Sequence, residues 1–267
     1  MTKTTINGCE YFYESQGDSP ETILFSHGLL MTHEAFREQI DYFKSTYRTV
    51  IFDHRGHGKT QTTDNGYELD SLTNDISALI EFLNIGKIHY VGHSMGGFIG
   101  LRLAARRPDL VKSLVLLNTS AEAEAHMWRY RLLRFITQAL GVKFVANSVH
   151  KLNFSKKFHH NPKREAVSRF WLNHFSSLPK TIIQAADPVL NRASVESELA
   201  NISCPTLIIG GKEDIALSPQ NSQLMHEKIA HSSLTLFEKV GHCAMIEEPD
   251  AVNQLIAQFL QSLPKDN

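Results

Sequence analysis

Short apolar segments alternate along this chain with segments whose apolar residues recur at helical spacing. Continuous apolar runs are typical of strands buried on both faces of a parallel sheet, and the recurring stripes predict helices that cover those faces. The chain is therefore expected to be an α/β protein with a mostly parallel central sheet and helices on both faces. The expected strands are ETILFSHG, KIHYVG, KSLVLLNTS and the starts of YRTVIFDHRGHG, CPTLIIGGKED and SSLTLFEKVGHC.

Two segments depart from this alternation. The first residues alternate around Asn7-Gly8, a dipeptide typical of two-residue turns, which predicts a hairpin. Residues 121–195 carry helical patterns but no strand run, so they are interpreted as a helical insertion. Residues 1–120 and 196–267 would then form the α/β core.

Composition excludes several classes of function. The chain has 27 basic and 28 acidic residues among its 267, so nucleic acid and membrane surfaces are not expected partners. We expect neither a leader nor a membrane helix, because the first residues show no apolar run and no window reaches roughly 18 consecutive apolar residues. Three cysteines at unrelated spacings favour neither disulfides nor a metal site. We expect a cytoplasmic protein that binds a small molecule without metal or cofactor; the sequence indicates no oligomeric state.

The segment Gly92-His93-Ser94-Met95-Gly96 is the strongest chemical signal. It matches G-x-S-x-G, follows a predicted strand and opens a predicted helix, which is the context of a nucleophile elbow. The alternative is an unreactive glycine-rich connection. The strand and helix context favours Ser94 as a nucleophile.

A serine nucleophile needs a base, and the base needs an acid that orients it. Asp214 ends one predicted strand and His242 ends the last one, in the chain order serine, acid, base. Asp214 could instead form a turn, with Glu213 as a competing acid, and His242 could be a buried structural histidine. The strand-end positions favour Asp214 and His242 as the triad partners.

The anionic intermediate of such a reaction needs N–H donors placed beforehand. One is expected from Met95, directly after the nucleophile, and a second from Leu29 in SHGLLM. His27 is interpreted as a structural hydrogen-bonding residue of that loop.

The ordered motifs SHGLL, FDHRGHGKT, GHSMGG, GGKEDIALSP and GHCAMIEEP resemble those of alpha/beta-hydrolase-fold serine hydrolases of the small capped type. The resemblance covers essentially the whole chain and implies Ser94, Asp214 and His242 as triad, with Leu29 and Met95 as oxyanion donors. It also implies that residues 121–195 form a cap over the pocket.

Candidate substrate contacts are Leu30 near the oxyanion loop and three aromatic residues of the insertion, Trp128, Phe135 and Trp171. Aromatic residues at helical spacing more often serve packing, so this alternative stays open. Arg129, Arg131 and Arg134 are interpreted as a solvated face, although one of them could bind a substrate carboxylate.

The favoured function is hydrolysis of a small or medium carboxylic ester or lactone through an acyl-enzyme on Ser94. The GHSMGG region is similar to enol-lactonases for 3-oxoadipate and to haloperoxidase-like esterases. Two alternatives remain: carbon–carbon bond hydrolysis of the meta-cleavage type, and a non-catalytic ligand sensor.

Overall fold

An eight-stranded sheet forms the centre of the molecule, and the computed structural model describes residues 2–124 and 127–264. The strand order is β1-β2-β4-β3-β5-β6-β7-β8, with every pair from β4 to β8 parallel. The predicted α/β fold with a mostly parallel sheet is confirmed. The strands are Thr2–Ile6, Cys9–Gln16, Thr22–Ser26, Arg48–Phe52, Ile88–His93, Val111–Leu117, Thr206–Gly211 and Ser232–Phe237, numbered β1 to β8 in chain order.

The predicted hairpin at the start of the chain is also confirmed. Strands β1 and β2 pair antiparallel, with Ile6 opposite Cys9. The two residues between them, Asn7 and Gly8, have φ angles of 46° and 74°. Left-handed angles at both positions match the right-handed twist of the strands, which explains the Asn-Gly pair.

Helices cover both faces of the sheet. Successive strand residues point to opposite faces, so Leu24 and Val50 belong to one core cluster while Ile23 and Ile51 belong to the other. One face carries α1 (Arg37–Phe43) and α11 (Pro249–Ser262), and the other carries α2 (Leu69–Leu83), α3 (Met95–Arg106) and α9 (Pro219–Lys228). The sheet is therefore buried on both sides, as its continuous apolar strands require.

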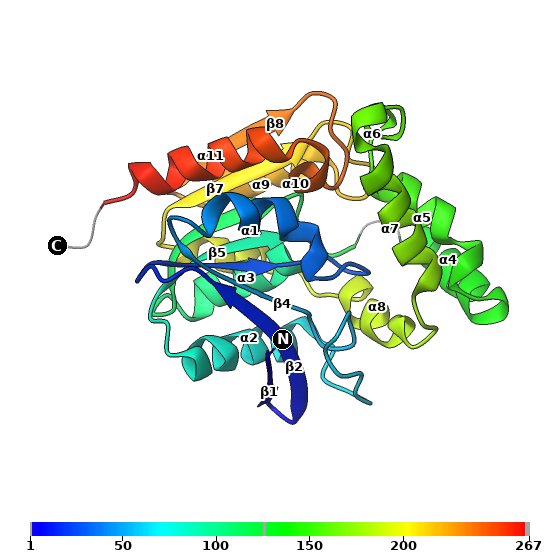
Figure 1. Cartoon of the computed structure of the whole chain (residues 1–267), viewed down its shortest axis with the longest axis horizontal. Helices are drawn as coiled ribbons and strands as arrows, with labels where there is room; N and C mark the ends of the chain where they lie inside the picture. Colours follow the sequence, from blue (N-terminus) through cyan, green and yellow to red (C-terminus); the bar gives the residue numbers. More distant parts are fainter. Residues whose placement is uncertain (1, 125–126, 265–267) are drawn as a thin grey trace.

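Between β6 and β7, the described residues form helices and no strand. Helices α4 to α8, here called the inserted helices, gather on one side of the molecule, far from the C-terminal end of α11 (Figure 1). The division into a core and a cap stays a prediction. The inserted helices are Met127–Leu140, Ala146–Asn153, Lys156–His159, Glu165–Ser177 and Ile182–Leu190.

In the part of the chain that the structure describes, no helix combines the length and apolar character needed to cross a membrane.

The loop after β4 is organised around one buried carboxylate. Asp53 accepts hydrogen bonds from the His33 N–H at 2.7 Å, from the Lys59 N–H at 2.8 Å and from the His33 ring at 2.9 Å. Gly58 closes this loop with a φ angle of 51°, and a Cβ atom there would lie 2.2 Å from Asp53 Oδ2. The position therefore requires glycine both for its backbone angle and for the space beside the carboxylate.

Replacing Gly58 by alanine should destabilise the protein more than the same change at Gly8. Both glycines have a left-handed φ, but a Cβ at Gly8 would meet nothing within 4 Å. Urea unfolding should show a loss of about 1 kcal/mol for Gly8→Ala from backbone strain and about 3 kcal/mol for Gly58→Ala, where the clash is added. Equal losses of unfolding free energy in the two variants would show that the Asp53 loop rearranges to accommodate the added Cβ.

Candidate active site

Ser94 sits on a strained turn where strand β5 passes into helix α3. Its φ and ψ angles are 49° and −112°, a region that non-glycine residues rarely occupy. Strand and helix approach closely there, because a Cβ at Gly92 would lie 2.5 Å from the Gly96 carbonyl oxygen. A Cβ at Gly96 would lie 2.1 Å from the Ser26 carbonyl oxygen. The two glycines of G-x-S-x-G therefore provide the space that this turn needs.

Strand β6 and the residues after it hold the turn in place. The Ser94 N–H donates to the Leu117 carbonyl at 3.0 Å, and the Thr119 hydroxyl donates to the Ser94 carbonyl at 2.8 Å. These bonds fix the backbone on both sides of the serine hydroxyl.

The structure brings Ser94, His242 and Asp214 together, although they are far apart in the chain. His242 Nε2 lies 2.9 Å from Ser94 Oγ, and His242 Nδ1 lies 2.8 Å from Asp214 Oδ2. All three residues are at most 9% exposed. An Nδ1–H that donates to the carboxylate leaves the Nε2 lone pair free to accept the serine proton.

The alternative acid, Glu213, is exposed at the surface of the same loop. Asp214 is instead fixed inside it: Oδ1 accepts the N–H groups of Ala216 and Leu217, both at 2.9 Å. The carboxylate therefore faces His242 without needing to reorient.

Asn118, directly after β6, is a site residue that the sequence reasoning missed. Its Nδ2 group donates to Asp214 Oδ2 at 3.1 Å and to the Gly241 carbonyl at 3.0 Å. Its φ angle is 46°, a conformation that asparagine tolerates better than most residues. A polar residue at the end of an apolar strand run, as in LLNTS, was the available signal. Asn118 joins the loop of Asp214 to the loop of His242.

The turn from Gly28 to Met31 lies beside the serine. The Met31 N–H donates to the Gly28 carbonyl at 3.2 Å, and Leu30 has a φ of 66°, as at the third position of a type II turn. Leu29 and Leu30 line the same cavity as Ser94. Met95 is the first residue of α3, where N–H groups have no partner within the helix.

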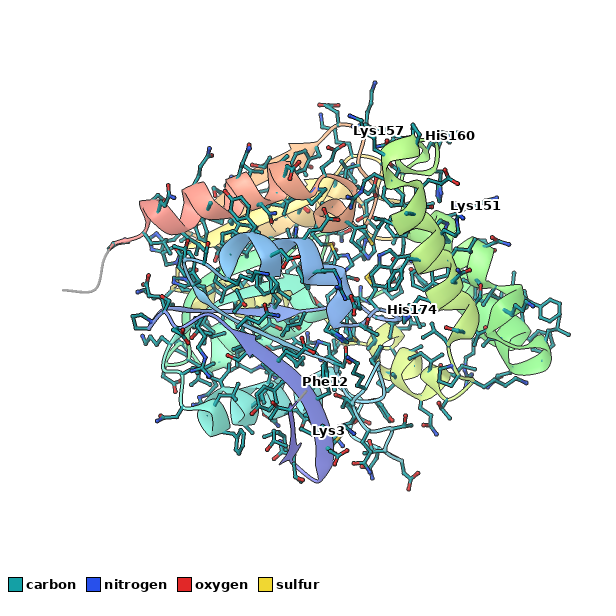
Figure 2. All side chains as sticks on the ribbon, in the orientation of Figure 1. Lys3, Phe12, Lys151, Lys157, His160 and His174 are labelled. Atoms are coloured by element: carbon teal, nitrogen blue, oxygen red, sulfur yellow. The ribbon has the colours of Figure 1, made fainter. Side chains whose placement is uncertain are left out.

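Histidines hold this turn from both sides. The Leu30 N–H donates to His57 Nε2 at 3.3 Å, and burial lowers the pKa of His57 to about 4, so that the ring is neutral and can accept. On the other side His174 of α7 donates from Nε2 to the Leu30 carbonyl at 2.9 Å. Figure 2 shows His174 where α7 meets the rest of the molecule. An inserted helix is thus bonded to the turn beside the serine.

His27 has the structural role expected of it. Its Nδ1 lies 2.8 Å from the Gly28 carbonyl, and its Nε2 accepts the His54 N–H at 3.0 Å. Burial, with help from the neighbouring histidines, keeps the pKa of His27 well below its usual value.

A cavity of about 150 Å³ opens beside Ser94 and His242, between the sheet and the inserted helices. Its lining is predominantly apolar, and most of it comes from the inserted helices and the residues around them. Apolar side chains on this lining include Phe98, Leu133, Val142, Val145, Val149, Leu152, Phe175, Leu178, Ile182, Ile183, Val189, Leu190 and Leu217.

The three aromatic residues expected in the pocket lie elsewhere, whereas Leu30 does line the cavity. Trp128 and Phe135 are each 68% exposed, because they occupy the outer face of α4. Trp171 is buried, but it packs against His174 and Phe175 instead of facing Ser94. The alternative of packing therefore describes Trp171, whereas Trp128 and Phe135 neither line the cavity nor are buried by packing.

Among residues 2–124 and 127–264, no group of three or more histidine, cysteine or acidic side chains is placed to hold a metal ion.

Comparisons with known proteins show which proteins this chain is similar to. A 3-oxoadipate enol-lactonase of Acinetobacter baylyi is 29% identical over 92% of this chain and 90% of its own. A provisionally named carbamate hydrolase, RutD, of Agrobacterium fabrum is 29% identical over 92% of this chain and 94% of its own. The crystal structure of an enol-lactonase from Burkholderia xenovorans superposes with a TM-score of 0.91 at 24% identity, covering 98% of this chain and all of that one.

The family model of the alpha/beta hydrolase fold matches residues 21–249, which include the strained serine turn, both loops of its hydrogen-bonded partners and the inserted helices. The chain belongs to the alpha/beta hydrolase fold family.

Proposed function

We propose that this protein hydrolyses a small or medium carboxylic ester or lactone through an acyl-enzyme on Ser94. The observation that carries the proposal is the line of hydrogen bonds from Asp214 through His242 to Ser94, with distances of 2.8 and 2.9 Å. His242 takes the serine proton as the hydroxyl attacks the carbonyl carbon, and then donates it to the leaving alcohol. A water molecule, activated by the same histidine, releases the acid.

The N–H groups of Leu29 and Met95 serve as the oxyanion donors in this proposal. Leu29 lines the cavity beside Ser94, and Met95 is at the N-terminus of α3, where the helix dipole favours negative charge. Donors of this kind are already oriented when the charge develops, so no reorganisation is needed.

The relatives support ester or lactone cleavage as the reaction class. Two of the proteins compared are named as enol-lactonases. A third is named as a carbamate hydrolase, and this name describes cleavage of a different acyl bond. The bond cleaved here is proposed on the geometry of the site, and these names agree with it.

Replacing Ser94 by alanine should lower kcat for p-nitrophenyl esters or lactones by about 10⁴-fold or more, because the attacking oxygen is lost. His242→Ala should be about as severe, and the double variant little worse, because the two residues act in one step. Turnover of graded esters, lactones and a ring-cleavage dienoate by the purified proteins measures this.

A fluorophosphonate probe provides the complementary measurement, since it labels an activated serine whatever the substrate. Absence of Ser94-dependent labelling would contradict the proposal and favour the ligand sensor. Labelling combined with turnover of the dienoate alone would instead identify a carbon–carbon bond hydrolase.

Asn118→Gly should lower kcat by roughly 10- to 100-fold, because the acid loses the amide that joins it to the His242 loop. Glycine keeps the left-handed backbone, so folding should be little affected. Asn84→Gly is the matched control, since Asn84 also has a left-handed φ of 48° but lies exposed at the end of α2. A similar loss in both variants would remove any role for Asn118 in the site.

His174→Leu should reduce kcat more than it raises KM, because the turn carrying Leu29 loses one of its two histidine bonds. We expect roughly a 5-fold loss of kcat, of the size that one hydrogen bond of about 1 kcal/mol contributes. His174→Gln, which keeps a donor, should recover part of it.

His160→Leu is the control for this change. His160 also belongs to the inserted segment, but its ring bonds to the Lys156 carbonyl within the same segment and lies at the outer end of these helices (Figure 2). If His160→Leu lowers kcat as much as His174→Leu, the bond to Leu30 is not the cause.

A further inference from the structure

The cavity beside Ser94 contains charged side chains, and they occur as pairs. Four charged residues line it: Glu124, Arg134, Asp187 and Arg192. Arg192 Nη1 lies 3.4 Å from Glu124 Oε2, and Arg134 Nη2 lies 2.8 Å from Asp187 Oδ2. In the described part of the lining, each cation therefore already faces a carboxylate of the protein.

The pair of Arg192 and Glu124 is the buried one. Their side chains are 3% and 5% exposed, whereas those of Arg134 and Asp187 are 47% and 34% exposed. The Arg192 guanidinium also donates to the Glu122 carbonyl at 3.0 Å and lies 4.1 Å above the centre of the Phe98 ring. Phe98 is one helical turn beyond Ser94, and its N–H donates to the Ser94 carbonyl. This cation and Ser94 line the same cavity.

A substrate carboxylate entering this cavity would compete with Glu124 for the arginine. If it displaced Glu124, that buried carboxylate would lose its ion pair with Arg192, which is unfavourable. If the substrate carboxylate did not displace Glu124, two carboxylates would share the one guanidinium of Arg192 in a mostly apolar cavity. An uncharged acyl group avoids both costs and gains from the apolar lining.

We propose that the cavity selects uncharged apolar acyl groups, and that Glu124 determines this specificity by neutralising Arg192. The inference rests on the proposed function of Ser94. The cavity also limits the size of the acyl group: an apolar volume of about 150 Å³ accommodates a group on the order of benzene, or about six carbon atoms. The preferred substrate class is therefore an ester or lactone with a short uncharged acyl part.

Two esters of matched length test this directly. The p-nitrophenyl ester of pentanoic acid is uncharged, and the mono-p-nitrophenyl ester of succinic acid ends in a carboxylate at a similar chain length. The wild-type protein should have a kcat/KM about 100-fold higher for pentanoate, of the size expected for a buried unpaired charge. Comparable values for both esters, or a preference for succinate, would overturn the proposal.

Glu124→Gln should reduce that ratio at least 10-fold, because Arg192 becomes available to the succinate carboxylate. Glu122→Gln is the matched control: it removes a charge two residues away, but its carboxylate bonds to Asn221 and does not line the cavity. An unchanged ratio in Glu124→Gln, or an equal change in Glu122→Gln, would contradict the role of Glu124. Circular dichroism and thermal unfolding check that both variants fold.

Binding to the Ser94→Ala protein separates this inference from the catalytic one, because it needs no turnover. Calorimetry with the stable amides pentananilide and succinanilic acid should show tighter binding of the uncharged amide, and Glu124→Gln added to Ser94→Ala should narrow the difference. If no ester is cleaved but the uncharged amide still binds more tightly, the proposed function is wrong and the proposed specificity is supported. If esters are cleaved but the anionic amide binds as tightly as the uncharged one, only the proposed specificity is wrong.

Discussion

The close approach of helix α3 to strand β5 is the constraint on which the rest of the site depends. It exists because Gly92 and Gly96 present no side chains to one another or to Ser26, and it forces Ser94 into a left-handed backbone conformation. Such strain costs on the order of 1–3 kcal/mol and persists only where the surroundings fix it. Here the fixed surroundings are the bonds from Leu117 and Thr119, which come from the neighbouring strand.

Parallel pairing then determines which other residues can reach the serine. Strands β5 to β8 are neighbours and point the same way, so the residues that follow each of them meet at one edge of the sheet. Ser94, Asn118, Asp214 and His242 each follow one of these strands. The hydrogen bonds among them therefore follow from topology, although they join residues up to 148 positions apart.

Contacts through His174 and Ser155 help to connect the inserted helices to the loops around Ser94. His174 bonds to the Leu30 carbonyl, and Glu247 accepts both the Gly241 N–H at 3.0 Å and the N–H and hydroxyl of Ser155. Burial raises the pKa of Glu247 to about 7, against the effect of these donors. Movement of the inserted helices would thus displace both the turn of Leu29 and the loop of His242. These helices line the cavity and are also hydrogen-bonded to the loops on its opposite side.

Much of the fold could be predicted from the sequence, because apolar periodicity and turn residues report local structure. The strands, the Asn7-Gly8 hairpin and the strand-to-helix context of Ser94 are of this kind. Substrate contacts were less predictable, since α4 presents Trp128 and Phe135 outward and periodicity does not say which face of an inserted helix meets the sheet. Asn118 was missed because its importance depends on Asp214, which only the folded chain brings near.

The same distinction separates the parts of the chain that strand pairing constrains from the parts that can vary. The serine turn and its hydrogen-bonded partners are built on sheet strands, where a shift of one residue would misplace every side chain. Most of the cavity lining comes instead from the inserted helices and adjoining residues, whose side chains can change without disturbing strand pairing. The Arg192 and Glu124 pair belongs to this second group, because both residues lie between β6 and β7. Removing one carboxylate there would change the charge at the cavity wall while leaving Ser94 and His242 in place, and for that reason fold and family alone do not determine the acyl group.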